Sequence, residues 1–312
     1  VPGILLLKNP QWLLGTVDMD AAIAAKVTAY LGLLAWGLPA SLFYRTFYAF
    51  CNALGKPRVL MGIGIASLAL HALLAWGLAL KGWAGAPLGI IGCALSSVLI
   101  AWLACLGGAA WLAFGPLGKR YRPFADWAAP DAGRWRELLR LGLPMGLSNL
   151  VEITAFTLIS LFIASLGAGV VAGHRIVANL SALTYMLPLS LAIATMAAVG
   201  QAVGSRDWRQ AHAVIKAGLL LAALLSTLVG VLLWFAAAPV IAAYTDDPEV
   251  RVVAGGLIGY VALYQFFDAL QTVAGHALRA YRVTFVPMLV QTFCFWGVGL
   301  LGGSWLCYRW SP

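Results

Sequence analysis

Residues 142–152 read GLPMGLSNLVE, and the rest of the architecture can be worked out from this stretch. It belongs to an apolar segment that extends over residues 137–166, with Asn149 and Glu152 near its middle. About 20 mostly apolar residues are enough for a helix to cross the roughly 30 Å hydrocarbon core of a bilayer. The stretch therefore predicts a transmembrane helix that carries a carboxyl group inside the membrane.

The composition of the whole chain favours a membrane protein. Among its 312 residues, 62% are hydrophobic and only 10% are charged, and the mean hydropathy is +0.90. A soluble domain normally has about 25% charged residues, so most of this surface must face lipid. The net charge of +9 does not indicate a nucleic-acid partner, because the basic residues lie between the apolar segments and form no continuous stripe.

Apolar segments recur along the chain, separated by short polar breaks. We expect an all-α, polytopic transmembrane helix bundle with nine such segments, the first of them truncated. The segments are 3–15, 24–54, 58–80, 88–114, 137–166, 173–203, 210–244, 249–279 and 284–308.

The basic residues predict the orientation of the helices. Lys and Arg collect in every second break, as is typical of cytoplasmic loops. These residues are Lys56, Arg58, Lys119, Arg120, Arg122, Arg134, Arg136, Arg140, Arg206, Arg209, Lys216, Arg279 and Arg282. The alternate breaks are mostly acidic, with Asp18, Asp20, Asp246, Asp247 and Glu249. The long basic break around residues 115–136 is therefore expected on the cytoplasmic side, where it divides the chain in two.

A weak internal repeat spans this division. Residues 53–61 (ALGKPRVLM) resemble residues 277–288 (ALRAYRVTFVPM), and each stretch joins two apolar segments on the same side of the membrane. Repeated helix bundles are typical of transporters that alternate access to a central site. The repeat predicts two pseudo-symmetric lobes.

Two carboxylates, Glu152 and Asp268, lie within apolar segments. A charge at the bilayer centre costs about 2.5–3.5 kcal/mol on insertion scales, so such residues usually have a function. Helical spacing places Asp268 in a polar and aromatic stripe, which we expect to face the protein interior. The stripe consists of Tyr260, Tyr264, Asp268, Gln271 and Gly275.

These side chains suit more than one task. Carboxylate, hydroxyl and carbonyl oxygens bind hard cations, and a carboxyl group removed from water takes up a proton more readily. The alternative is a purely structural carboxylate that hydrogen-bonds to Asn149 or Tyr264. The sequence shows no metal-site spacing, P-loop or nucleophile motif, and its five cysteines are scattered, so we expect neither an enzyme nor a bound cofactor.

Three long strings resemble one family of transporters. Residues 142–152 are similar to the start of the seventh helix in multidrug and toxic compound extrusion (MATE) transporters of the NorM-like branch. Residues 173–204 (GHRIVANL through MLPL to VGQAVG) resemble the helix that follows, and residues 268–281 (DALQ through LRAY) resemble the tenth helix. The resemblance extends over essentially the whole chain.

The resemblance implies a twelve-helix fold of two six-helix lobes, of which this chain is a fragment. Residues 1–120 would be a partial N-terminal lobe, from the end of helix 3 to helix 6. Residues 121–136 would be the cytoplasmic inter-lobe loop, and residues 137–312 a C-terminal lobe of helices 7 to 11 without helix 12.

The resemblance also implies a site and a function. Glu152, Asp268 and Tyr264 would bind the coupling ion, with the two carboxylates holding Na⁺ if sodium drives transport. Asp268, Gln271, Asn149 and Asp247 would contact the substrate. The protein would be a monomeric antiporter in a bacterial inner membrane, in contact with lipid, that exports cationic amphipathic molecules in exchange for Na⁺ or H⁺.

Three other functions fit the sequence less well. A lipid-linked sugar flippase of the same superfamily should have basic residues that grip a pyrophosphate, whereas the charges predicted inside this membrane region are acidic. An intramembrane enzyme would need a nucleophile or metal cluster, which the sequence lacks. A channel fits the repeated lobes and single acidic centre less well than a carrier does.

Overall fold

The computed structural model describes residues 2–11, 20–83, 85–116, 118, 131–164 and 166–310, and every secondary-structure element in these ranges is a helix. Eight helices among them are long and apolar enough to cross a membrane. They correspond to eight of the nine expected segments. The truncated first segment contributes the short helix α1 (Pro2–Lys8), and its last residues lie outside the described ranges.

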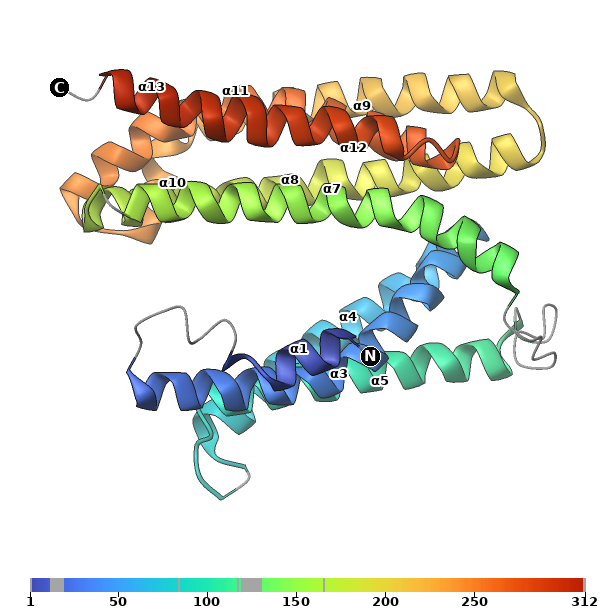
Figure 1. The fold of residues 1–312 in the computed structure, drawn as a ribbon, viewed down its shortest axis with the longest axis horizontal. Helices are drawn as coiled ribbons and strands as arrows, with labels where there is room; N and C mark the ends of the chain where they lie inside the picture. The colour runs from blue at the N-terminus through green and yellow to red at the C-terminus, as the bar shows by residue number, and fades with distance from the viewer. Residues whose placement is uncertain are drawn as a thin grey trace. The chain divides into compact units, whose positions relative to one another are not determined.

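The chain divides into two compact units, residues 1–129 and 130–312. In the first unit, α3 (Ala21–Ala53) packs against α1, α4 (Pro57–Ala75) and α5 (Ile90–Phe114), as Figure 1 shows. The π-helix η1 (Trp76–Lys81) continues α4. Phe47, Cys51, Leu60 and Leu112 form the buried core of this unit.

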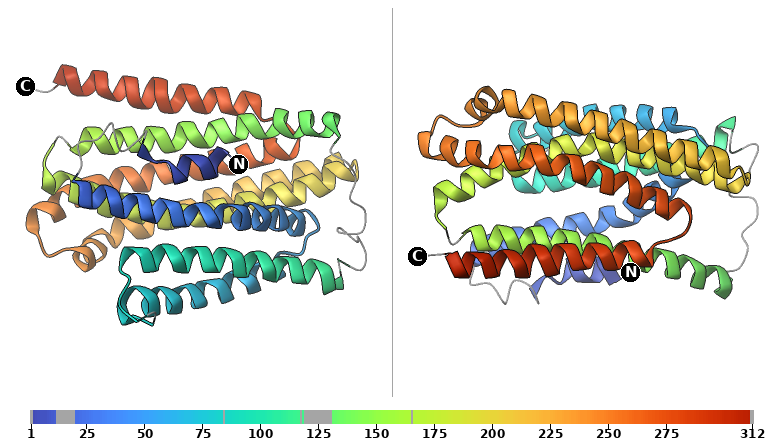
Figure 2. Two further views of the ribbon diagram at one scale, coloured as in Figure 1. Left: turned by 60° about the horizontal axis from the view of Figure 1, so that its bottom comes forward. Right: turned by 90° about the horizontal axis from the view of Figure 1, so that it is seen from above.

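The second unit contains the predicted site and consists of two groups of helices. In one group, α8 (Ala168–Gly204), α9 (Trp208–Phe235) and α11 (Pro248–Ala280) pack tightly against each other, and the short α10 (Ala237–Tyr244) joins α9 to α11. In the other, α7 (Ala132–Ala164) packs along α12 (Phe285–Thr292) and the π-helix η2 (Phe293–Gly302), which leads into α13 (Gly303–Trp310). Figure 2 shows α7 side by side with the helical segment formed by η2 and α13 in both views.

Small residues let α8, α9 and α11 approach closely. A Cβ atom on Gly173 would come within 2.9 Å of the Val253 Cβ, and one on Gly230 within 2.9 Å of the Ala262 carbonyl oxygen. The opposite face of α9 is a row of exposed leucines at four-residue spacing: Leu220, Leu224, Leu228 and Leu232. An apolar face of this kind is stable against lipid and not against water.

Three helices end in the same way on the side that we expect to be cytoplasmic. The turns after α3, α8 and α11 each contain a residue with positive φ: Gly55 (65°), Arg206 (61°) and Arg282 (62°). In each turn the next amide donates to a carbonyl five residues earlier, as in a Schellman motif. Because the same turn also follows α8, it does not fix the register of the predicted repeat, which stays a prediction.

Two expected boundaries differ from the structure. The segment 210–244 is not one helix, because α9 ends at Phe235 and α10 begins at Ala237. Pro239 explains the break, since its ring would clash with the Phe235 carbonyl in a continuous helix. Helix α7 begins at Ala132, within the segment expected as a loop, while residues 119–130, including three of the basic residues, lie outside the described ranges.

Candidate functional site

A cleft lies between α11 on one side and α12 with η2 on the other. Its volume is about 460 Å³, counted as the space open to the centre of a water molecule. Its walls are mostly apolar and aromatic, and Asp268 is the charged residue among those that line it. The lining residues are Tyr264, Phe267, Asp268, Gln271, Ala274, Gly275, Leu278, Val286, Pro287, Val290, Gln291, Cys294 and Phe295.

The predicted stripe on α11 forms one wall of this cleft. Tyr264, Asp268, Gln271 and Gly275 all line it, as their helical spacing requires, whereas Tyr260 at the start of the stripe is exposed and lies outside the lining. Asp268 is half-buried and close enough to Glu152 to interact with it electrostatically. The structure therefore brings the two predicted carboxylates together from α11 and α7.

Glu152 is hydrogen-bonded to a residue that lines the cleft. Its carboxylate oxygen Oε2 accepts a bond of 3.1 Å from the side-chain amide of Gln291, which itself lines the cleft. Five residues after Gln291, in η2, the Trp296 indole donates to the backbone carbonyl of Val151 at 3.3 Å. These two bonds hold the carboxylate-bearing part of α7 against α12 and η2.

Two tyrosines connect the site to α8. The hydroxyl groups of Tyr264 and Ser181 are in hydrogen-bond contact, which links the cleft wall to α8. The Tyr185 hydroxyl makes a hydrogen-bond contact with Thr272 and interacts electrostatically with both Glu152 and Asp268. Two phenolic hydroxyl groups and the Gln291 amide thus lie within interaction distance of one or both carboxylates.

Arg279 lies near the carboxylates, although the sequence pattern assigned it to the cytoplasmic break. It belongs to the last turn of α11, is half-buried, and interacts electrostatically with Glu152 and Tyr185. Its guanidinium group lies 3.3 Å from Nε2 of His276. The positive charge of Arg279 offsets part of the negative charge of Glu152.

The other two predicted substrate contacts lie outside the cleft lining. Asn149 is an exposed residue of α7, one turn before Glu152. Asp247 caps the first turn of α11, where its carboxylate accepts a bond of 2.9 Å from the Glu249 amide. Asp247 precedes Asp268 by 21 residues, so the two are separated by roughly 30 Å along the helix at 1.5 Å per residue.

The side chains at the site are of the kinds that can bind a hard cation. Asp268 lines the apolar cleft, Glu152 interacts with it electrostatically, and amide and phenolic oxygens lie nearby, which are ligands that hard cations prefer. In the part of the chain that the structure describes, no group of three or more His, Cys, Asp or Glu side chains is placed to hold a metal ion. A bound Na⁺ would therefore need amide or hydroxyl oxygens in addition to the carboxylates.

Sequence reasoning missed several residues of the site, among them Tyr185. Gln291, Ser181 and Arg279 join it through partners that are distant in the sequence, apart from the local contact of Arg279 with His276. Polar residues inside apolar segments were a usable signal for Gln291 and Ser181. No local pattern could have paired them with Glu152 and Tyr264.

Comparisons with known proteins relate the chain to one family. The MatE family model matches residues 1–76 and 144–305. A probable multidrug resistance protein NorM of Aromatoleum aromaticum is 50% identical over 309 residues, which cover 99% of this chain and 67% of that protein. The multidrug resistance protein PmpM of Pseudomonas aeruginosa is 34% identical over 302 residues, which cover 96% of this chain and 62% of that protein.

Solved structures show the same fold. The Vibrio cholerae MATE transporter VcmN in the bent form matches with a TM-score of 0.85 at 15% identity, and the eukaryotic MATE transporter AtDTX14 with 0.86 at 19% identity. Each match covers 99% of this chain and 68% of the other. The chain thus spans about two thirds of the length of the proteins that it matches.

Proposed function

Because the chain belongs to the MatE family of multi-pass membrane proteins, we propose that it forms the larger part of an antiporter that exports organic cations in exchange for Na⁺ or H⁺. The names of its relatives support multidrug export as the broad function. The exchange ion and the cationic nature of the substrate are inferences from the site.

One observation supports this proposal more than any other. Asp268 lies in the wall of an apolar and aromatic cleft of about 460 Å³ and interacts electrostatically with a second carboxylate, Glu152. A cleft of this size suits a drug-sized molecule. Negative charge beside the aromatic rings of Phe267 and Phe295 favours a molecule that is both cationic and apolar.

Exchange follows if the two cations use the same negative charge. In the proposed cycle, an organic cation binds in the cleft while Asp268 and Glu152 are ionised. After the lobes open to the outside, Na⁺ or H⁺ binds to the carboxylates and lowers the affinity for the organic cation, which leaves. Ligands that compete for one charge are coupled by their different affinities for the states of the carrier.

A lipid-linked sugar flippase is the second candidate. A pyrophosphate would need several basic groups in the cleft, and Arg279, which interacts electrostatically with Glu152, is not among the residues that line it. Its charge is already offset by Glu152, and the lining of the cleft is acidic. These charges favour an organic cation over an anionic lipid.

Transport in inverted vesicles tests the proposal. The full-length protein should move a fluorescent cationic dye when a Na⁺ or a pH gradient is imposed separately, and Asp268→Asn should abolish this movement without loss of folded protein. Dye transport that persists in a folded Asp268→Asn variant would contradict the proposal. An absence of transport under either gradient would favour the flippase.

A further inference from the structure

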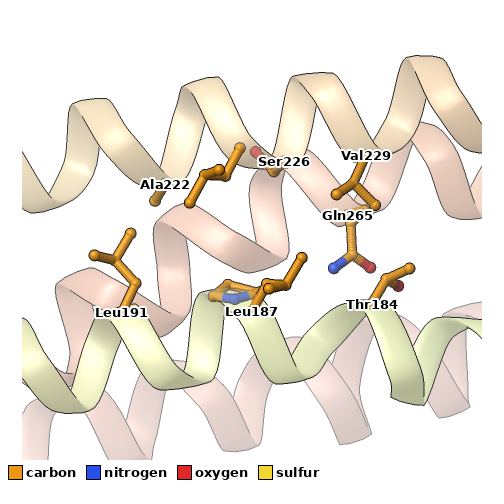
Figure 3. Close-up of a pocket in the computed structure, with 9 residues that line it drawn as sticks. Thr184, Leu187, Leu191, Ala222, Ser226, Val229 and Gln265 are labelled. Atoms are coloured by element: carbon orange, nitrogen blue, oxygen red, sulfur yellow. The ribbon is translucent and has the colours of Figure 1, made fainter.

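A second, much smaller cavity is enclosed by α8, α9 and α11. Its volume is about 10 Å³, counted in the same way as that of the cleft, which is about the space that one water molecule needs. Figure 3 shows the amide of Gln265 from α11 directed into it, between Thr184 and Leu187 on α8 and Ser226 on α9. None of these residues belongs to the lining of the cleft.

Gln265 has an unsatisfied polar atom in this cavity. The side chain is 1% exposed, and its oxygen Oε1 is buried without a hydrogen-bond partner. A buried polar group without a partner costs about 1–3 kcal/mol, so native proteins almost always satisfy it with protein or ordered water. The cavity lies where that partner would have to be.

The other polar groups at the cavity can accept a further hydrogen bond. The Thr184 hydroxyl donates to the carbonyls of Leu180 and Ser181, and the Ser226 hydroxyl donates to the Ala223 carbonyl, so both oxygens have acceptor capacity left. Pro188 adds to this excess, because it has no N–H to donate to the Thr184 carbonyl. A guest in the cavity must therefore be a hydrogen-bond donor or a cation.

The charge of the cavity distinguishes these two guests. No carboxylate lines it, and its other walls are apolar: Leu187, Pro188, Leu191, Ala222, Leu225 and Val229. A cation buried there would lack a counter-charge, which is costly, whereas a water molecule can donate both of its hydrogens.

We infer that this cavity holds one buried water molecule, which donates to Gln265 Oε1 and to a hydroxyl oxygen of Thr184 or Ser226. The water links α11 to α8 or α9 at the position where Pro188 interrupts the hydrogen bonds of α8. Gln265 is the residue after Tyr264, which lines the cleft and whose hydroxyl contacts Ser181 of α8. The inference does not depend on the transported substrate.

Labelling with hydroxyl radicals tests for the water directly. X-ray radiolysis of the purified full-length protein converts bound water into radicals that oxidise adjacent side chains, so Pro188 and Leu191, which line the cavity and are buried or partly buried, should be labelled. Gln265→Met should lose this labelling, because methionine has a similar length but no amide. Gln210→Met, the same change at an exposed position of α9, should retain it.

Thermal unfolding is an independent test, because Gln265→Met should change Tm in opposite directions with and without a bound water molecule. If water is present, Gln265→Met breaks a satisfied network and should lower Tm by about 2–4 °C. If the cavity is dry, the same change removes an unsatisfied oxygen and should raise Tm, which would overturn the inference. The double variant Thr184→Val/Ser226→Ala removes both hydroxyl acceptors at the cavity, should weaken the same labelling, and serves if Gln265→Met does not fold.

A cation in place of water has its own signature. Replacing choline by Na⁺ would then raise Tm in an Asp268→Asn background, in which the cleft carboxylate is neutral, and Gln265→Met would remove that rise. This result would also overturn the inference. We expect instead that Na⁺ has no effect through Gln265.

Discussion

The side-chain amide of Gln291 donates a hydrogen bond of 3.1 Å to the carboxylate of Glu152, across 139 positions of sequence. Glu152 belongs to α7 and Gln291 to α12, which lies on the opposite side of the cleft from Asp268. Through this bond, a carboxylate that interacts with Asp268 is fixed to the facing wall. Binding of a cation to the carboxylate pair would therefore act on both sides of the cleft.

Gln291→Leu should weaken the binding of the coupling ion. Without the amide donor, Glu152 loses a hydrogen bond to a charged group and is free to turn away from Asp268. Such bonds contribute about 1.5–3 kcal/mol, so the ion concentration for half-maximal transport should rise roughly tenfold at this half-buried position. Gln210→Leu at an exposed position is the control, and an unchanged ion dependence in Gln291→Leu would show that the bond has no part in coupling.

Tyr264→Phe should slow transport because it removes the hydroxyl contact with Ser181 between α11 and α8. Ser181→Ala removes the same contact from the other side. If the contact is what matters, the double variant should be no slower than the slower single variant. Initial rates of dye uptake into inverted vesicles give this comparison, and fully additive losses would assign the two hydroxyls separate roles.

Phe267→Ala should lower the affinity of the cleft for organic cations. The ring lines the cleft and is exposed to its interior space, where it can lie against a bound cation. Contacts between cations and aromatic rings contribute about 0.5–2 kcal/mol, which corresponds to roughly 2- to 30-fold in Kd. Phe267→Leu keeps most of the apolar surface but loses the ring, and a Kd for a cationic dye that is as low in Phe267→Leu as in the unmodified protein would mean that apolar surface alone determines the affinity.

Two variants of Asp247 distinguish a structural role of this residue from a role in binding. Asp247→Ala removes the cap of α11 and should cost about 1 kcal/mol of stability, whereas Asp247→Ser keeps a capping oxygen and should not. Contact between Asp247 and exported cations stays a prediction from resemblance. Weaker dye export in a fully stable Asp247→Ser variant would support that contact, and normal export would leave the cap as the only role of this residue.

Much of the fold could be predicted from the sequence, because hydropathy determines where a helix can cross the membrane. The stripe on α11 was also predictable, since Tyr264, Asp268 and Gln271 follow helical spacing within one segment. The break at Ala236 was missed although Pro239 signals it. The pseudo-symmetric arrangement of two lobes stays a prediction. The turns at Gly55 and Arg282 have similar geometry, which is compatible with a repeat.

The partners of the site were beyond the reach of sequence patterns. Gln291 and Arg279 approach Glu152 only because α7 packs along α12 and because α11 extends to Ala280. The π-helical turns of η2 also change which side chains face the cleft, and no periodic pattern indicated them. Contacts between helices depend on packing, which a single segment of sequence does not encode.

The central claim is that the coupling ion and the organic cation compete for the negative charge of Asp268 and Glu152. Equilibrium binding of a fluorescent organic cation to the purified full-length protein, titrated with Na⁺ at fixed pH and with H⁺ without Na⁺, tests it most directly. We predict that at least one ion raises the apparent Kd in the unmodified protein, and that Asp268→Asn weakens dye binding and removes the ion effect. Dye that binds Asp268→Asn as tightly as the unmodified protein, or a Kd that neither ion changes, would contradict the account.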